Sequence, residues 1–114
     1  MEDRTTEPKE IPEHLFSQVQ GDVTILWVKP TTTPHSLATR IWALLVEGKK
    51  VATRGMGAGP TNQAGKAWAI VRQRVASEGS ELLLKPYFQS VSWHGEASSA
   101  LVFEGVLIGS CPAS

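Results

Sequence analysis

The feature that most constrains the fold of this chain is its hydrophobic pattern, which changes twice from strand-like to helix-like and then stays strand-like. Strand-like runs alternate apolar and polar residues, whereas helix-like runs repeat apolar residues every three or four positions. The pattern predicts the order β-α-β-α-β-β. In chain order it indicates a strand over residues 23–28, a helix from 34 to 48, a strand over 49–55, a helix from 60 to 79, and strands over 81–90 and 97–107.

Both predicted helices have start and stop signals in the sequence. Thr33 can cap the first helix, and Pro34 follows it at the first helical position, where the missing N–H costs little. Pro60 starts the second helix, and Gly48 and Gly79 end the two helices as left-handed caps. The second helix has one apolar face, made of Ala64, Ala67, Trp68, Val71 and Val75.

This order of elements predicts a two-layer α+β sandwich within the broad α/β class. Two strand–helix–strand crossovers place both helices on one face of a four-stranded mixed sheet. The other face must be exposed or covered by a partner, so we expect a homodimer. Pro86 interrupts the strand at 81–90, which indicates an edge position or a bulge.

The charges divide the chain into an acidic arm and a mildly basic body. Residues 1–20 contain two basic and five acidic residues, and the rest contains nine basic and six acidic ones, so a net charge of zero conceals −3 and +3. We expect a disordered arm at 1–20, one folded domain at 21–108 and a short tail at 109–114. The arm either shields a basic surface or keeps the protein soluble.

The sequence lacks the arrangements that are typical of enzyme active sites. Its three histidines fall in the arm, at a helix start and in a hairpin turn, so they do not converge on a carboxylate. In the glycine run before the second helix, Gly59 and Gly65 stand one residue too far apart for a phosphate-binding loop. Pro60 occupies the third glycine position of a dinucleotide fingerprint. We therefore expect no catalytic activity and no cofactor.

Membrane and metal partners are not expected either. No stretch approaches the ~20 apolar residues that cross a bilayer, and residues 1–14 lack the apolar region of a signal peptide. Cys111 is the single cysteine, which excludes an intrachain disulfide and a cysteine cluster for metal. The expected location is the cytoplasm.

Cations outside the arm are the remaining candidates for a function. They can contact phosphates or form an ordinary solvated surface, and composition alone leaves both interpretations open. Trp93, beside the predicted hairpin turn, can stack on a base or pack on the sheet. Eight of these nine cations are candidates: Lys29, Lys49, Lys50, Arg54, Lys66, Arg72, Arg74 and Lys85.

The string G-A-G-P-T-N-Q-A-G-K-A at residues 57–67 resembles the G-A-G-x-x-N-Q-A-x-K-A string of the stage V sporulation protein S family. Weaker matches flank it at 29–36, at 86–88 and at 94–96, and the resemblance covers residues 28–106. It implies the Alba-like fold, with β-α-β-α-β-β topology, a homodimer or higher oligomer, and nucleic-acid binding. It also implies an association with spore development.

Carried over by position, the resemblance implies that Lys29 contacts phosphate and that the hairpin at 93–98 reaches a groove. The string I-V-R-Q-R at 70–74 is similar to the I-V-R-x-R string of Alba proteins. Few cations are available, so we expect weak, sequence-independent binding of DNA or RNA through the backbone. The expected interface residues are Lys29, Arg54, Asn62, Gln63, Lys66, Arg72, Arg74, Trp93, His94 and Ser98.

A second hypothesis is a regulatory scaffold with no nucleic-acid role. In that case Asn62 and Gln63 hold a subunit or a protein partner, because an amide bonds equally well at a protein interface and at a phosphate. A small-ligand sensor that uses the glycine run is a third alternative. The sequence leaves open whether the partner is DNA, RNA or protein, and whether the oligomer is a dimer or a tetramer.

Overall fold

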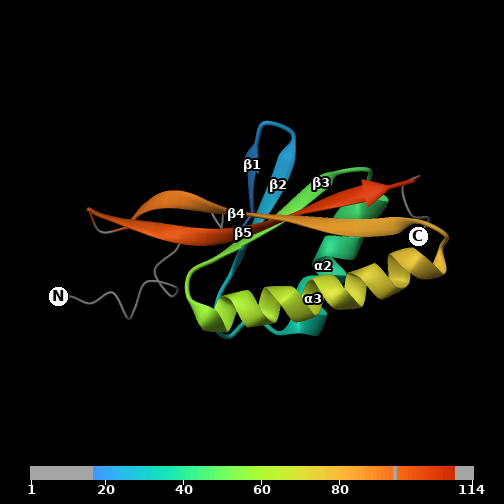
Figure 1. Cartoon of the computed structure of the whole chain (residues 1–114), viewed down its shortest axis with the longest axis horizontal. Coiled ribbons are helices and arrows are strands. Elements are labelled where there is room, and N and C mark those ends of the chain that lie inside the picture. The colour runs from blue at the N-terminus through green and yellow to red at the C-terminus, as the bar shows by residue number, and fades with distance from the viewer. Residues whose placement is uncertain (1–16, 94, 110–114) are drawn as a thin grey trace.

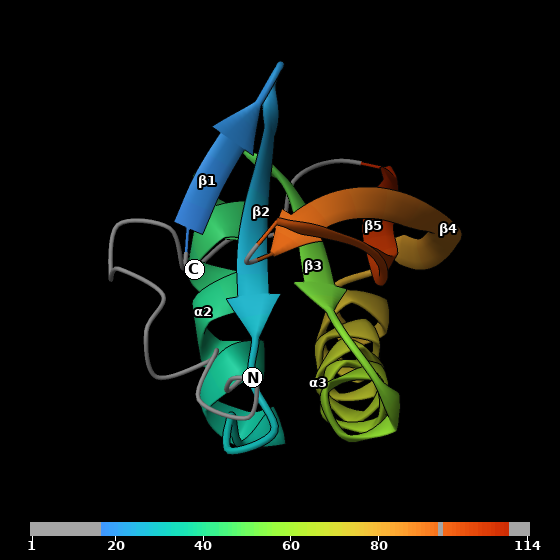
Figure 2. The ribbon, with the colours of Figure 1, turned by 90° about the vertical axis from the view of Figure 1, so that its left-hand side faces the viewer.

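The computed structural model describes residues 17–93 and 95–109, which form one mixed sheet and two helices (Figure 1). Both helices lie on the same face of the sheet, as expected (Figure 2). In chain order the elements are β1 (Ser17–Gln20), β2 (Val23–Val28), α2 (Pro34–Val46), β3 (Lys50–Gly55), α3 (Ala58–Ser77), β4 (Glu81–Trp93) and β5 (Glu96–Ile108).

The sheet has five strands in the order β1-β2-β3-β5-β4, so the expectation of four strands is wrong. β2 and β3 are parallel, and every other neighbouring pair is antiparallel. The additional strand is β1, which falls in the segment assigned to the arm. Its sequence, Ser-Gln-Val-Gln, contains a single apolar residue, so its pairing with β2 depends on main-chain hydrogen bonds rather than on a hydrophobic face.

The boundaries of α2 follow its local signals. The N-cap residue is Thr33, whose Oγ1 accepts a hydrogen bond from the N–H of Ser36 at 3.3 Å. Pro34 occupies the first turn. At the other end Gly48 has a φ of 82°, the left-handed conformation predicted for it.

The helix α3 begins at Ala58, two residues before the predicted start at Pro60. Gly57 is its N-cap residue and has a φ of 92°, which favours glycine. A Cβ on Gly55 would lie 2.7 Å from the Cβ of Pro60, so the strand end and the helix start pack closely. The glycine run therefore turns the chain directly from β3 into α3.

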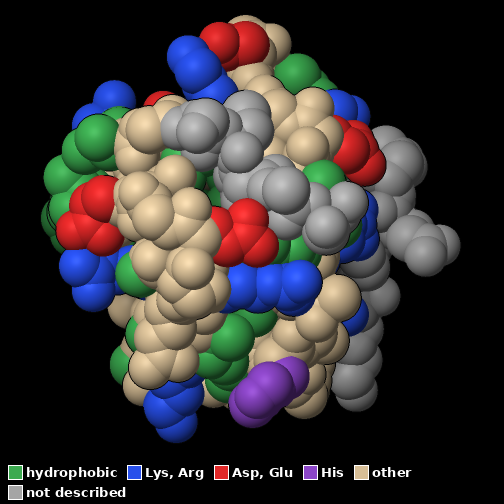
Figure 3. Space-filling view, turned by 90° about the vertical axis from the view of Figure 1, so that its right-hand side faces the viewer, with side chains coloured by type: hydrophobic (Ala, Val, Ile, Leu, Met, Phe, Trp, Pro, Cys, Tyr) green, Lys and Arg blue, Asp and Glu red, His purple; other side chains and the backbone are tan. Residues whose placement is uncertain are grey.

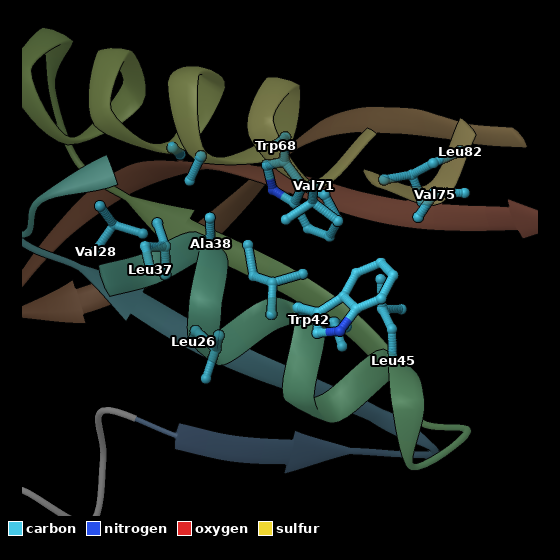
Figure 4. Close-up of a cluster of buried hydrophobic side chains, with 14 residues drawn as sticks. Leu26, Val28, Leu37, Ala38, Trp42, Leu45, Trp68, Val71, Val75 and Leu82 are labelled. Atoms are coloured by element: carbon cyan, nitrogen blue, oxygen red, sulfur yellow. The ribbon is translucent and has the colours of Figure 1, made fainter. Parts of the chain in front are cut away.

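The main core lies between the two helices and the sheet face that they cover (Figure 4). Trp68 is 1% exposed, and its Nε1–H donates a hydrogen bond to Thr53 Oγ1 on β3 at 2.9 Å. A polar ring atom is thereby satisfied inside an apolar layer. The sheet contributes Leu26, Val28 and Val51 to the same cluster.

The opposite face of the sheet has a smaller apolar cluster of Ile25, Ala52 and Val102. It is bordered by large apolar side chains that remain exposed, namely Leu83, Val106 and Ile108. Leu83 and Val106 are cross-strand partners in β4 and β5. Neither helix covers this face (Figure 2).

The β4–β5 hairpin extends beyond the rest of the sheet. Each strand has 13 residues, whereas β3 pairs only with residues 101–104 of β5. Residues 96–100 of β5 therefore pair with β4 alone and project from the body. Pro86 lies in β4, at the edge of the sheet, where its missing N–H is tolerated.

Candidate nucleic-acid interface

Two segments lie together at one end of the molecule, the β2–α2 loop and the first turns of α3 (Figure 2). The loop and the helix start follow the carboxyl ends of β2 and β3, which are parallel neighbours. Loops after adjacent parallel strands emerge at the same edge of a sheet, where many ligands bind. The β4–β5 hairpin projects on the side of the molecule where α3 begins, but at the level of the sheet and apart from the helix (Figure 1).

The β2–α2 loop is a compact turn. The N–H of Lys29 donates to Thr32 Oγ1 at 2.9 Å, and the N–H of Thr32 donates back to the Lys29 carbonyl oxygen at 3.0 Å. This reciprocal pair fixes the backbone that carries Lys29, whose side chain is half-buried. The loop therefore holds its lysine in a defined place.

Gln63 joins the loop to α3. Its side-chain Nε2 donates a hydrogen bond to the carbonyl oxygen of Thr32 at 3.0 Å. A Cβ on Gly59 would lie 3.9 Å from the Cβ of Pro30, so the loop and the helix start are in contact beyond this bond. The amide of Gln63 is used within the chain, which gives this expected interface residue a structural role.

The first two turns of α3 present Asn62 and Lys66 to solvent. These residues are four positions apart, so they are neighbours on one side of the helix. The first turn contains no acidic residue, and its N-cap glycine has no side chain to satisfy the N–H groups there. A helix start of this kind favours a negatively charged group.

Arg40 is a cation at this end that the sequence analysis did not select. It lines a groove of about 260 Å³ together with Lys29, Thr32 and Ser36. Ser36 and Arg40 are four positions apart on α2. That spacing, directly after the lysine-bearing loop, is the signal in the sequence that would have found Arg40.

The hairpin is described only in part. Ser98 is half-buried and pairs with Val91, while Trp93 pairs with Glu96 across the turn. His94 and the side chain of Trp93 lie outside the described residues. The backbone of residues 93 and 95–98 forms the projecting tip of the hairpin, on the side of the molecule where α3 begins (Figure 1).

Arg54 is the penultimate residue of β3, and its side chain lies on the face of the sheet opposite the helices. Its guanidinium is 5.2 Å from the centre of the Trp27 ring and donates a hydrogen bond to Gln89 Oε1. The residue is 8% exposed, and burial lowers the pKa of its guanidinium. Its contacts link three strands of the sheet.

Arg72 and Arg74 lie in the second half of α3, with Arg72 roughly 21 Å along the axis from Ala58. Arg72 pairs with Glu81 at 2.8 Å, and Arg74 lies 4.1 Å from the centre of the Trp42 ring. At that end of the molecule, acidic and basic side chains are interspersed (Figure 3). The structure therefore does not bring these two arginines together with Lys29 and Lys66.

The described part of the chain also contains neither a candidate metal site nor a membrane-spanning helix. Residues 17–93 and 95–109 contain no group of three His, Cys, Asp or Glu side chains placed to hold a metal ion. Within the same ranges, no helix is both long enough and apolar enough to span a membrane.

Comparison with protein families identifies a match. The sequence model of stage V sporulation protein S (SpoVS) matches residues 24–107. The matched range starts in β2 and ends in β5, so it includes the loop, the start of α3 and the hairpin. The chain belongs to the stage V sporulation protein S family, and this membership suggests a role related to sporulation.

Proposed function

We propose that the chain binds DNA or RNA weakly through the sugar–phosphate backbone, using the end formed by the loop, the α3 start and the hairpin. The observation that carries this proposal is that Lys29, Arg40 and Lys66 lie on adjoining segments at that end. No acidic residue interrupts the loop at 29–33 or the helix start at 57–66. The proposed role in sporulation is regulatory and non-enzymatic.

Weak binding follows from the number of cations. Each phosphate neutralised on duplex DNA contributes about 0.9 to the slope of log affinity against log salt. Three cations therefore give a slope of roughly −3, well below that of strong DNA-binding proteins. Such contacts read the backbone and carry little sequence information.

We further propose that the fold is Alba-like, with β1 added at one edge, and that two or four copies associate. The exposed apolar side chains of Leu83, Val106 and Ile108 support association, because a face with such residues is a frequent contact surface between subunits. Association would also place two basic ends in one particle. Linked sites bind a long polymer more tightly than a single site does.

A titration by fluorescence anisotropy tests the nucleic-acid proposal. Labelled duplex DNA, single-stranded DNA and RNA are titrated with the full chain at several salt concentrations. The double variant Lys29→Ala/Lys66→Ala should weaken binding and reduce the salt slope by about 2 on duplex DNA.

The matched control is Lys49→Ala/Lys50→Ala. It removes the same charge from two exposed lysines that lie where α2 ends and β3 begins, at the other end of these elements from the proposed interface. Lys49 pairs with Glu47, and Lys50 pairs with Asp22. Its salt slope should equal that of the unmodified chain. Equal losses in the two double variants would contradict a localised interface, and no binding at low salt would contradict the proposal altogether.

The exposed apolar face favours a second candidate function, a scaffold that binds another protein without nucleic acid. In this case Leu83→Ser/Val106→Ser abolishes partner binding or self-association, while the salt concentration has little effect on that association. Sedimentation of the full chain with and without this change separates association through that face from binding at the basic end.

A further inference from the structure

A groove lies beside the end of β2, between that strand and the first turns of α2. Leu26 and Leu37 provide its apolar part and are 3% and 5% exposed. Lys29 and Arg40 provide positive charge. None of the described residues that line it is acidic, so it suits a ligand with apolar and acidic groups.

The pairing of β1 with β2 brings the chain directly to this groove. Ser17 is the cross-strand partner of Leu26, and β2 continues for two residues beyond that pair, to Val28. β1 is antiparallel to β2, so the residues before Ser17 are directed along β2 toward Lys29. Continued in the same register, residue 15 would lie opposite Val28, on the sheet face that the helices cover.

The sequence before Ser17 has the composition that the groove requires. Residues 1–16 contain five acidic and two basic residues, the opposite sign to the groove. The part nearest Ser17 is Glu-Ile-Pro-Glu-His-Leu-Phe, at 10–16, in which two glutamates alternate with large apolar residues. An extended chain covers about 3.3 Å per residue, so these seven residues span roughly 23 Å, enough to reach across the first turns of α2.

We propose that residues 10–16 of this chain occupy the groove. Leu15 packs against Leu26 and Leu37, and Glu10 and Glu13 lie near Lys29 and Arg40. The bound segment covers two of the three cations assigned above to phosphate, so it competes with nucleic acid. Only this competition rests on the proposed function; docking itself does not.

Paramagnetic relaxation tests the docking in the absence of nucleic acid. A nitroxide label is attached at residue 14 in the full chain carrying His14→Cys and Cys111→Ser. The amide signals of Thr32, Ser36 and Arg40 should broaden strongly, while those of residues 72–77, in the second half of α3, should not.

Charge variants distinguish docking from chance contacts of a tethered chain. Glu10→Lys/Glu13→Lys should reduce the broadening at Ser36 and Arg40 several-fold. Glu2→Lys/Asp3→Lys changes the net charge equally and should leave it intact. Adding Arg40→Glu to the first variant should restore part of it. Equal effects of the two double variants, or broadening centred away from the groove, would overturn the proposal.

Nucleic-acid titrations of the same variants without the label test the competition. Glu10→Lys/Glu13→Lys should raise affinity at least several-fold more than Glu2→Lys/Asp3→Lys does. Broadening at the groove with no nucleic-acid binding by any variant supports docking and contradicts the proposed function. Salt-dependent binding without broadening at the groove contradicts docking and leaves the proposed function standing.

Discussion

Gly105 marks a place where a single carbon atom decides the packing. Gly105 in β5 faces the ring of Trp68, and a Cβ there would lie 2.7 Å from Cη2 and 2.8 Å from Cζ3. Trp68 is held from the other side by its hydrogen bond to Thr53. The indole therefore occupies the space that any side chain at position 105 would need.

Gly105→Ala is expected to lower the free energy of unfolding by about 1–3 kcal/mol, the usual cost of overpacking a core. Gly65→Ala is the matched control, because a Cβ at this position of α3 has nothing within 4 Å. It should raise stability by up to about 1 kcal/mol, since alanine favours a helix over glycine. Urea denaturation measures both, and an unchanged Gly105→Ala midpoint would contradict the packing described for Trp68.

The hydrogen bond from Gln63 to the loop supports a second prediction. Gln63→Ala is expected to lower the free energy of unfolding by about 1 kcal/mol and to weaken nucleic-acid binding, because the loop that carries Lys29 loses its tie to α3. Asn62→Ala, at an exposed neighbouring position, should change stability by less than about 0.5 kcal/mol. Denaturation and anisotropy measured on both variants would contradict this role for Gln63 if the two behave alike.

At the scale of elements, the sequence predicted those whose boundaries depend on local signals. Thr33 and Gly48 delimit α2 as expected, because caps act within one turn. The start of α3 was placed two residues late, since Pro60 was taken as the first helical residue while Gly57 is the N-cap. β1 was missed because an edge strand with one apolar residue has no periodic pattern to detect.

The residues expected at the candidate site also differ in how far local sequence patterns indicate their positions. The family resemblance selected Lys29 and Lys66, and the structure places the segments that carry them after the ends of two adjacent parallel strands. Successive side chains of a strand point to opposite faces of the sheet. Thr53 contacts Trp68 of α3, so Arg54 faces away from the helices. Arg72 lies in the second half of α3, far from the helix start, a position that the helix predicted over residues 60–79 already implied.

The ion pair between α3 and β4 predicts a pH dependence. The hydrogen bond from Arg72 holds the pKa of Glu81 below its usual value of 4.5. The folded pKa lies below the unfolded one, so the pair adds stability above pH 4.5, and this contribution is lost as pH falls through the folded pKa. Arg72→Ala should raise the pKa of Glu81 in an NMR titration, whereas Arg74→Ala should not.

At the scale of the whole molecule, charged side chains are distributed differently at the two ends, and the helices cover only one face of the sheet. The helices cover one face, and the other carries exposed apolar residues of β4 and β5 (Figure 2). Lys66 lies in the first half of α3 and Lys29 in the adjoining loop, whereas the end of the molecule seen in Figure 3 mixes acidic and basic side chains. In the proposed function, the apolar face is used for association and the end with Lys29, Arg40 and Lys66 contacts nucleic acid.

The central claim is that nucleic acid meets the loop, the α3 start and the hairpin together. The most direct measurement is an NMR titration of the full chain with a short duplex, followed at assigned amides. The account predicts salt-sensitive shifts at residues 29–33, 57–66 and 95–98, and little change at residues 72–79. Shifts concentrated around Leu83, Val106 and Ile108, or no shifts at low salt, would contradict it.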